Sequence, residues 1–363
     1  MRKGQIIHQW AAGASTGDAI TSYSLALRSM FRGWGCESEF FSDYRHVSFD
    51  ARRDCRDIRA FPEDLPRGSI VIYHFSIGSE LTARFLSLPP DITRVVCYHN
   101  ITPARYVRSL RPPMAKVLDE GRRQLALLAP AADFAIGDST YNCDEMREAG
   151  CPKTARVPLM WKRPDITPPP DPAVLASYSD GAVNWIFVGR VAPNKKLEDV
   201  IRSFHYFRKT VHPHSRLFLV GSFAGMERYV SSLRALTVEL DLPGVILTGH
   251  VTSSQLVAYY RLADLFVCMS EHEGFCLPLL EAMSFDVPVL AFEAAAVPET
   301  VGAGGVIFSR KDHPMVAETA GVMTEPGNVR ERLVAAGRER LGAFDEGTVE
   351  KTLLEALGPY LEV

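Results

Sequence analysis

The sequence predicts an α/β protein with two doubly wound domains, each a parallel sheet covered by helices. Apolar runs of strand length alternate with amphipathic segments along the whole chain, which is typical of βαβ units. A proline-rich stretch, KRPDITPPPDPAVLASYSDG, separates two halves that share this organisation and reads as a linker between domains. A chain of 363 residues is also long for a single core.

The composition is that of an ordinary globular protein, with 47% apolar and 23% charged residues. A formal net charge of −3 argues against general nucleic-acid binding. The seven cysteines show no CxxC or other zinc spacing, which favours reduced thiols over disulfides or zinc. The first apolar run is too short for a signal peptide, and no run of eighteen apolar residues is present. We therefore expect a cytoplasmic protein without a transmembrane helix.

In the first half, the run GQIIHQW predicts the first strand. The glycine-rich turn AGASTGD and a helix over residues 19–32 follow it. Three further apolar runs predict strands: SIVIYHF, TRVVCYHN and ADFAIGD. This half defines an N-terminal domain over residues 1–165.

The second half repeats the pattern after a linker over residues 166–182. Five apolar runs predict its strands: VNWIFVG, SRLFLVG, GVILTGH, ADLFVCM and VPVLAF. They define a C-terminal domain over residues 183–345. The final segment, TVEKTLLEALGPYLEV, is predicted to be an amphipathic helix, residues 346–363, that packs back on the N-terminal domain.

Polar and charged residues follow the ends of these strands. Ligands of open parallel sheets bind outside the carboxyl ends of the strands, so these residues are site candidates. They are Gly17, Asp18, His99, Asn100, Asp138, Ser139, Arg190, Lys195, Gly249, His250 and Glu273.

The stretch SEHEGFCLPLLEAM holds two glutamates, Glu273 and Glu281, around the start of a predicted helix. Pro278 suits the first helical turn, because its missing N–H would be unpaired there. Glu273 is then expected on the loop and Glu281 in the first turns of the helix, so both carboxylates can border one ligand. The backbone N–H groups of Gly274, Phe275, Cys276 and Leu277 are predicted to lie at the helix N-terminus.

Each signal also has an ordinary explanation. Arg190 and Lys195 suit a diphosphate, but charged residues on a solvated loop would look the same. The segment GASTGD can be a plain turn, and His99 can be a histidine satisfied within the core. GxGxxG is absent, which argues against a nicotinamide-dependent dehydrogenase.

The ordered motifs FVGRVAPNKK, GSFAGMERY, VILTGHV and SEHEGFCLPLLEAM resemble the glycogen-synthase-like retaining glycosyltransferases, the glycosyl transferases group 1. The resemblance covers most of the C-terminal half. It extends more thinly to the N-terminal half through STGDAI, CYHNITP and AIGDST. It implies the GT-B fold, with two Rossmann-like domains facing across a cleft. Two positions depart from the pattern, because Lys196 and Cys276 stand where many members have glycine.

The resemblance also implies roles for residues. Glu273 is expected to meet donor-sugar hydroxyls, and Glu281 is expected to accept hydrogen bonds from the ribose of the nucleotide. Arg190 and Lys195 are expected to hold the diphosphate, and His99 to contact the donor sugar. The remaining expected donor contacts are Gly17, Asp18, Gly249, His250, Val251, Gly274, Phe275, Cys276 and Leu277.

The activity implied is transfer of a UDP- or GDP-linked sugar to a hydroxyl acceptor, with retention, in cell-surface polysaccharide or glycolipid synthesis. No DxD-type motif is present, so no metal or other cofactor is expected. Two alternatives stay open. One is a sugar-nucleotide epimerase or hydrolase on the same fold, and the other is a non-catalytic nucleotide-sugar-binding protein.

The segment ARYVRSLRPPMAKVLDEGRRQLALL interleaves basic with apolar residues over positions 105–123. It is compatible with a solvated helix face. It is also compatible with a site for an anionic lipid-linked or polysaccharide acceptor at the inner face of the membrane.

Overall fold

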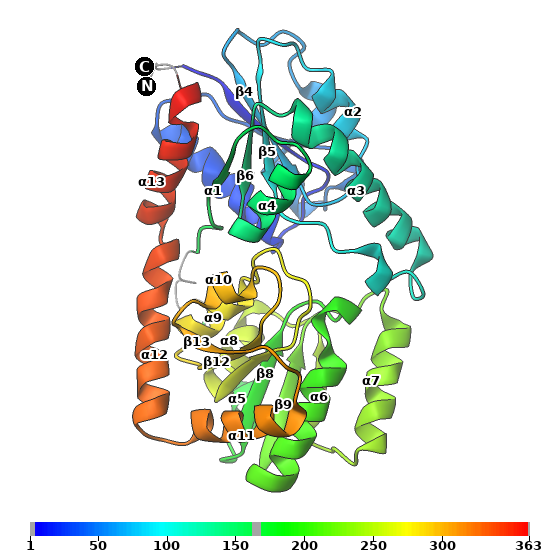
Figure 1. Cartoon of the computed structure of the whole chain (residues 1–363), viewed down its shortest axis with the longest axis vertical. Helices are drawn as coiled ribbons and strands as arrows, with labels where there is room; N and C mark the ends of the chain where they lie inside the picture. Colours follow the sequence, from blue (N-terminus) through cyan, green and yellow to red (C-terminus); the bar gives the residue numbers. More distant parts are fainter. Residues whose placement is uncertain (1–3, 162–167, 362–363) are drawn as a thin grey trace. The chain divides into compact units, whose positions relative to one another are not determined.

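The computed structural model describes residues 4–161 and 168–361, and its chain divides into two compact units (Figure 1). Unit 1 comprises Met1–Ala104, Pro113–Met160 and Glu346–Val363, and unit 2 comprises Arg105–Pro112 and Trp161–Asp345. The beginning of the proline-rich stretch, residues 162–167, lies outside the described residues. Each unit is built on one parallel sheet, which confirms the predicted α/β class.

Unit 1 contains a seven-stranded sheet in the order β3-β2-β1-β4-β5-β6-β7. All described pairings within it are parallel. The strands are β1 (Ile7–Ala11), β2 (Phe40–Ser42), β3 (Arg56–Asp57), β4 (Ile70–Phe75), β5 (Thr93–Tyr98), β6 (Phe134–Gly137) and β7 (Thr154–Arg156). Its main helices are α1 (Ala19–Gly33), α2 (Leu81–Leu86), α3 (Pro112–Ala131), α4 (Thr140–Glu148) and α13 (Glu346–Leu357).

Every residue of β1 and β4 is buried. Central strands of a parallel sheet are covered on both faces, which is why these runs are mainly apolar and lack polar residues at alternate positions. In unit 1 the sequence analysis missed the strands β2, β3 and β7. They are two or three residues long, too short to show a period.

Unit 2 contains a six-stranded parallel sheet in the order β10-β9-β8-β11-β12-β13. Its strands are β8 (Val183–Val188), β9 (Ser215–Val220), β10 (Val245–Gly249), β11 (Leu265–Cys268), β12 (Val289–Phe292) and β13 (Gly305–Phe308). Its helices are α5 (Pro172–Tyr178), α6 (Leu197–Tyr206), α7 (Glu227–Glu239), α8 (Ser253–Leu262), α9 (Pro278–Ser284), α10 (Val297–Val301), α11 (His313–Thr324) and α12 (Asn328–Leu341).

Helix α5 lies inside the stretch that the sequence analysis assigned to a linker. Asp171 caps it by accepting from the backbone N–H groups of Ala173 and Val174, and Pro172 occupies its first position. The proline-rich composition hid this helix, because proline is favoured both in linkers and in the first helical turn.

Candidate functional site

Both sheets have a point where the strand order reverses, and the candidate residues lie beside these points. In unit 1 the reversal falls between β1 and β4, and in unit 2 between β8 and β11. The loops that follow such a strand pair diverge toward opposite faces of the sheet, which leaves a crevice for a ligand. Lys195 follows β8 and Glu273 follows β11, so the two residues flank the reversal in unit 2.

Lys195 and Glu273 form an ion pair in unit 2. The Lys195 ammonium lies 2.5 Å from Oε1 and 2.6 Å from Oε2 of Glu273. The two side chains are only 20% and 8% exposed, so each charge depends on the other for its stability. Burial alone would lower the pKa of Lys195, but the Glu273 carboxylate reverses this, and the pKa is raised. The sequence analysis assigned these two residues to different parts of the donor, whereas here they contact each other.

Lys196 and Cys276, the two departures from glycine, both have a left-handed backbone. Lys196 has a φ of 52° and Cys276 a φ of 72°. Lys196 directly precedes α6, and Cys276 lies in the loop between β11 and α9. The glycine-like conformation is therefore kept at both positions although each carries a side chain. Gly274 and Phe275 precede Cys276 in this loop, and Leu277 lies at the N-cap of α9.

Glu281 is fixed by a tyrosine that the sequence analysis did not select. The hydroxyl of Tyr260, on α8, donates to Oε2 of Glu281 at 2.7 Å. The Tyr260 ring stacks on Phe285, with 5.0 Å between the ring centroids. Burial raises the pKa of Glu281, so the hydrogen bond from Tyr260 helps to keep this carboxyl group ionised. The sequence held no signal for this partner, because Tyr260 is 21 residues away.

Gly249, His250 and Val251 lie at and just after the carboxyl end of β10. Gly249 has a φ of 74°, and a Cβ atom there would lie 3.2 Å from the ring of Phe223. Glycine therefore lets an aromatic ring approach this turn closely. His250 is exposed and Val251 is half-buried.

Arg190 has a second arginine beside it. Its guanidinium donates to the carbonyl oxygen of Ala224 at 3.2 Å. Partial burial lowers the pKa of Arg190, and the positive charge of Arg111 lowers it further. Like charges that converge in this way favour an anionic ligand between them. Arg111 belongs to unit 2, and the sequence analysis had placed it only in the basic segment.

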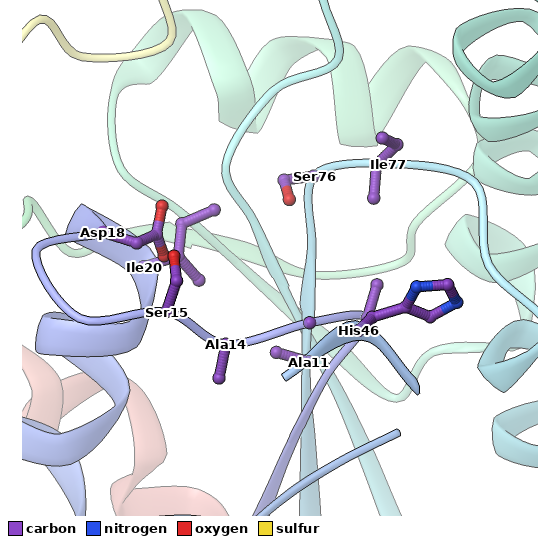
Figure 2. Close-up of a pocket in the computed structure, with 10 residues that line it drawn as sticks. Ala11, Ala14, Ser15, Asp18, Ile20, His46, Ser76 and Ile77 are labelled. Carbon is purple, nitrogen blue, oxygen red and sulfur yellow. The ribbon is translucent and has the colours of Figure 1, made fainter. Parts of the chain in front are cut away.

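A pocket of about 240 Å³ lies beside the strand reversal in unit 1 (Figure 2). It is lined by Ala11, Ala12, Gly13, Ala14, Ser15, Asp18, Ile20, His46, Ser76 and Ile77. Asp18 is the N-cap of α1 and accepts from the backbone N–H of Thr21. Gly17 is exposed in the preceding turn, with a φ of 81°. The glycine-rich turn thus forms one wall of a real pocket and also starts a helix.

His99 belongs to a buried hydrogen-bonded chain in unit 1. Its Nδ1 lies 2.8 Å from Oδ2 of Asp138, and its Nε2 lies 2.8 Å from Nδ1 of His74. Nε2 of His74 lies 2.9 Å from Oε1 of Gln9, whose own amide nitrogen donates to the Ser24 carbonyl. Both ring nitrogens of His99 are therefore engaged inside the unit, and its side chain is 3% exposed.

The ends of this chain determine its protonation. Asp138 and the Gln9 oxygen both accept, so His99 Nδ1 and His74 Nε2 must donate, and a third proton lies between the two rings. The two imidazoles therefore share one positive charge opposite the Asp138 carboxylate. Burial alone would lower the pKa of His99, but Asp138 and Cys97 raise it well above its ordinary value. The pKa of His74 is lowered, because the ring is buried and lies beside the charge of His99. Burial also raises the pKa of Asp138, which opposes a charge on its carboxyl group, whereas the charge of His99 and its hydrogen bond lower it.

Among the residues that the structure describes, two groups of side chains bring metal-ligand atoms within 4.8 Å of one another. They are His74, Cys97 and His99 in unit 1, and Cys268, Glu273 and Cys276 in unit 2. In the first group, His74 and His99 are hydrogen-bonded to each other. In the second group, the Glu273 carboxylate is paired with the Lys195 ammonium. A cation at either place would have to displace these partners.

The basic segment is partly structural. Arg122 pairs with Glu145 at 2.6 Å and donates to the carbonyl oxygen of Ile101. Arg105 lies over the ring of Tyr106, whose hydroxyl donates to Glu271. Among the described residues, no helix has both the length and the hydropathy needed to cross a bilayer.

Two parallel α/β units with candidate residues beside their strand reversals define the class of the protein as GT-B. Solved structures with the same fold cover nearly the whole chain. The sucrose-phosphate synthase of Thermosynechococcus elongatus matches with a TM-score of 0.72 and 17% identity, over 98% of this chain and 99% of its own. HepE of Anabaena, in complex with UDP-glucose, matches with a TM-score of 0.73 and 16% identity, over 98% and 100%.

The family follows from the sequence comparisons. Residues 179–340 match the model of the glycosyl transferases group 1, and this part of the chain is a domain of that family. The O-antigen chain mannosyltransferase B of Escherichia coli is 31% identical over 128 residues, 35% of this chain and 33% of the relative. The glycogen synthase of Mycobacterium tuberculosis is 26% identical over 225 residues, 61% of this chain and 53% of the relative. The chain thus spans about a third to a half of these two relatives.

Proposed function

We propose that the protein transfers a sugar from a UDP- or GDP-linked donor to a hydroxyl acceptor, with retention of the anomeric configuration. The observation that carries this proposal is the set of charges beside the β8 and β11 reversal of unit 2. Arg190, Lys195, Glu273 and Glu281 come from separate segments and lie within the group 1 glycosyltransferase match. Cations suit a diphosphate, and carboxylates suit the hydroxyls of a sugar and a ribose.

The chemistry needs a stabilised leaving group. Negative charge grows on the diphosphate as the glycosidic bond breaks, and Arg190 and Lys195 supply fixed positive charge for it. Lys195 must then exchange part of its pairing with Glu273 for the diphosphate, which frees Glu273 to accept from a donor-sugar hydroxyl. Glu281, oriented by Tyr260, accepts from the ribose. No metal ion has a role in this proposal.

The relatives support both donor types. HepE was solved with UDP-glucose, and a relative from Mycolicibacterium smegmatis is named GDP-mannose-dependent alpha-mannosyltransferase. Names such as O-antigen chain mannosyltransferase and lipopolysaccharide outer core galactosyltransferase favour a role in cell-surface glycan synthesis. The acceptor in this proposal is a growing polysaccharide or glycolipid, which is consistent with a protein that works at the inner face of a membrane. Co-sedimentation with anionic vesicles at low and high salt tests that location.

The first test is a thermal-shift panel of UDP, GDP and their sugar conjugates. A ligand present at about 100 times its dissociation constant adds about 2.7 kcal/mol to the stability of the folded protein. We expect one nucleotide series to shift the transition and the other to leave it unchanged. If no nucleotide diphosphate shifts it, the proposal is wrong.

The second test separates the two glutamates. Glu281→Gln is expected to weaken binding of the free nucleotide diphosphate and of the donor alike, because both carry the ribose. Glu273→Gln is expected to weaken only the donor, because the free nucleotide lacks the sugar. Calorimetry with both ligands measures this. If both variants bind like the parent protein, neither glutamate contacts the donor.

An epimerase or hydrolase on the same fold is the second candidate. It consumes the donor without an acceptor, whereas a transferase needs one. Incubation of the protein with the identified nucleotide sugar alone distinguishes the two, because rapid donor loss would favour the alternative. A binding protein without activity would show affinity but no loss under any condition.

A further inference from the structure

Cys276 adopts a backbone conformation that disfavours its own side chain. Its φ of 72° lies in the left-handed region, which is sterically unfavourable for a non-glycine residue. Glycine adopts this backbone conformation without strain, so the turn itself does not require a side chain at this position. Strain of this kind persists where a functional contact compensates for it.

The side chain of Cys276 faces a second thiol. Cys268, at the end of β11, has its sulfur within 4.8 Å of the Cys276 sulfur, and the Glu273 carboxylate lies in the same group. Cys268 is completely buried within the sheet, whereas Cys276 is partly exposed. The other cysteines of the chain are buried, so Cys276 is the thiol that solvent reaches most easily.

The charges around the two thiols differ. A hydrogen bond to the Cys276 thiol lowers the pKa of Cys268, and the same contact raises the pKa of Cys276. The Lys195 ammonium opposes part of that rise, because it favours a negative sulfur at Cys276. The arrangement therefore combines a partly exposed thiol with a buried thiol whose pKa is lowered.

We propose that Cys268 and Cys276 are a dithiol that closes reversibly into a disulfide and thereby switches the loop of residues 269–277. The bond itself depends only on the two cysteines, whereas its effect on donor binding rests on the proposed function. A disulfide requires the sulfurs to close to about 2.05 Å. Cys268 is held within the sheet, so the loop that carries Glu273 must move.

The oxidant in this proposal is a small disulfide such as oxidised glutathione. The Cys276 sulfur attacks one sulfur of glutathione disulfide, and the first glutathione leaves with the Cys276 proton. The Cys268 sulfur then attacks the Cys276 sulfur, and the second glutathione leaves with the Cys268 proton. One disulfide bond breaks and one forms. Two electrons pass from the protein dithiol to glutathione, and dithiothreitol reverses the reaction.

The first arm of the test measures the bond. No lysine or arginine lies between Arg261 and Arg310, so residues 262–310 form one tryptic peptide that carries both thiols. After treatment of the full chain with oxidised glutathione and then alkylation, we expect this peptide to lack two hydrogens and carry no alkyl group. Dithiothreitol should restore two alkylation sites.

The variants make this arm specific. Cys268→Ala and Cys276→Gly should each prevent the bond, and glycine suits the backbone of position 276, so that variant should fold. Cys151→Ser is the matched control, because it removes a buried thiol of unit 1 and should leave the bond unchanged. A stable glutathione adduct on Cys276, with Cys268 still free to alkylate, would overturn the proposal.

The second arm measures UDP and GDP binding by calorimetry before and after oxidation. We expect oxidation to weaken the preferred nucleotide by about tenfold or more, comparable to the loss of one charge-assisted contact. The Cys268→Ala protein should bind equally well under both conditions. A complete disulfide with unchanged affinity would contradict the switch. If the reduced protein binds neither nucleotide, the proposed function fails while the first arm still decides whether the disulfide forms.

Discussion

At the level of single residues, Lys195 has two tasks in this protein. It neutralises the buried Glu273 carboxylate, with both oxygens within 2.6 Å, and in the proposed function it holds the donor diphosphate. Lys195→Ala should therefore weaken nucleotide diphosphate binding by about 10- to 150-fold, the equivalent of a charge-assisted hydrogen bond of about 1.5–3 kcal/mol. Calorimetry measures this loss, and chemical denaturation separates it from the cost of leaving Glu273 unpaired.

The neighbouring residue provides the control for this prediction. Lys196 carries the same charge, and its ammonium lies 3.6 Å from Glu271 and 3.7 Å from Glu198. Lys196→Gln should retain nucleotide affinity within about twofold, since half-exposed ion pairs of this kind contribute little. Equal losses in the two variants would mean that the general positive charge of the loop, and no particular contact of Lys195, determines affinity.

Asp138 determines the charge of His99, and this predicts a pH dependence. The folded-state pKa of His99 is raised, so its stabilising charge is fully present below the unfolded pKa of about 6.5. It is lost only as the pH rises through the raised folded value. Asp138→Asn removes the carboxylate that raises this pKa, so the variant should lose the His99 proton at lower pH than the parent protein.

Titration of the histidine ring signals by NMR checks this prediction. In the parent protein, the chemical shift of the His99 ring should remain that of a protonated imidazole between about pH 5 and 8. The chemical shift of the His74 ring should remain that of a neutral imidazole. A variant that leaves the His99 titration unchanged would show that the shared proton does not depend on Asp138.

At the level of elements, helix α3 packs against the loop after β4 through two glycines. A Cβ atom on Gly121 would lie 2.7 Å from the backbone nitrogen of Gly78, and one on Gly78 would lie 2.7 Å from that of Gly121. Gly121→Ala must push these backbones apart, so we expect it to destabilise the protein by about 1–3 kcal/mol despite the better helix propensity of alanine.

Gly33, at the end of α1, is the matched control because nothing lies within 4 Å of a Cβ atom placed there. Gly33→Ala should change stability by less than about 1 kcal/mol, in the stabilising direction. Urea denaturation of both variants measures the difference. If Gly121→Ala is as stable as Gly33→Ala, the close contact between α3 and the loop is not rigid in solution.

At the level of the whole molecule, the end of the chain belongs to unit 1. Helix α13 buries Leu353 completely, and Glu350 accepts from the indole of Trp34 at 2.7 Å. In Figure 1, α13 lies beside α1. Leu353→Ala should cost about 2–5 kcal/mol, because it leaves a cavity in the core of unit 1.

Amide hydrogen exchange, measured for each strand, shows which unit loses stability in Leu353→Ala. Since the two units have separate cores, the strands of unit 1 should lose protection while β8 and β11 of unit 2 keep theirs. Leu354→Ala is the control, because that side chain is 36% exposed and its loss should change stability by less than about 0.5 kcal/mol. A uniform loss of protection in both units would show that they unfold as one.

The sequence alone determined the α/β class and the long central strands, because β1, β4 and β8 lie in mainly apolar runs. It also determined where polar residues follow strands, since this depends on chain order. The motif around Glu273 and Glu281 led to the family, which the match over residues 179–340 supports. Short edge strands such as β7 are too short to show a pattern of apolar residues in the sequence.

Only the tertiary structure decided which side chains meet. The contact between Lys195 and Glu273 depends on β8 and β11 being neighbours in the sheet, and that between Tyr260 and Glu281 depends on the packing of α8 and α9. The course of the loop between β11 and α9 brings Cys268 and Cys276 together. Sequence separation carries no information about such pairs. The protonation of His99 likewise depends on Asp138, His74 and Gln9, which arrive from three different strands or their ends. The physical reason is that pairing, burial and charge are properties of neighbours in space.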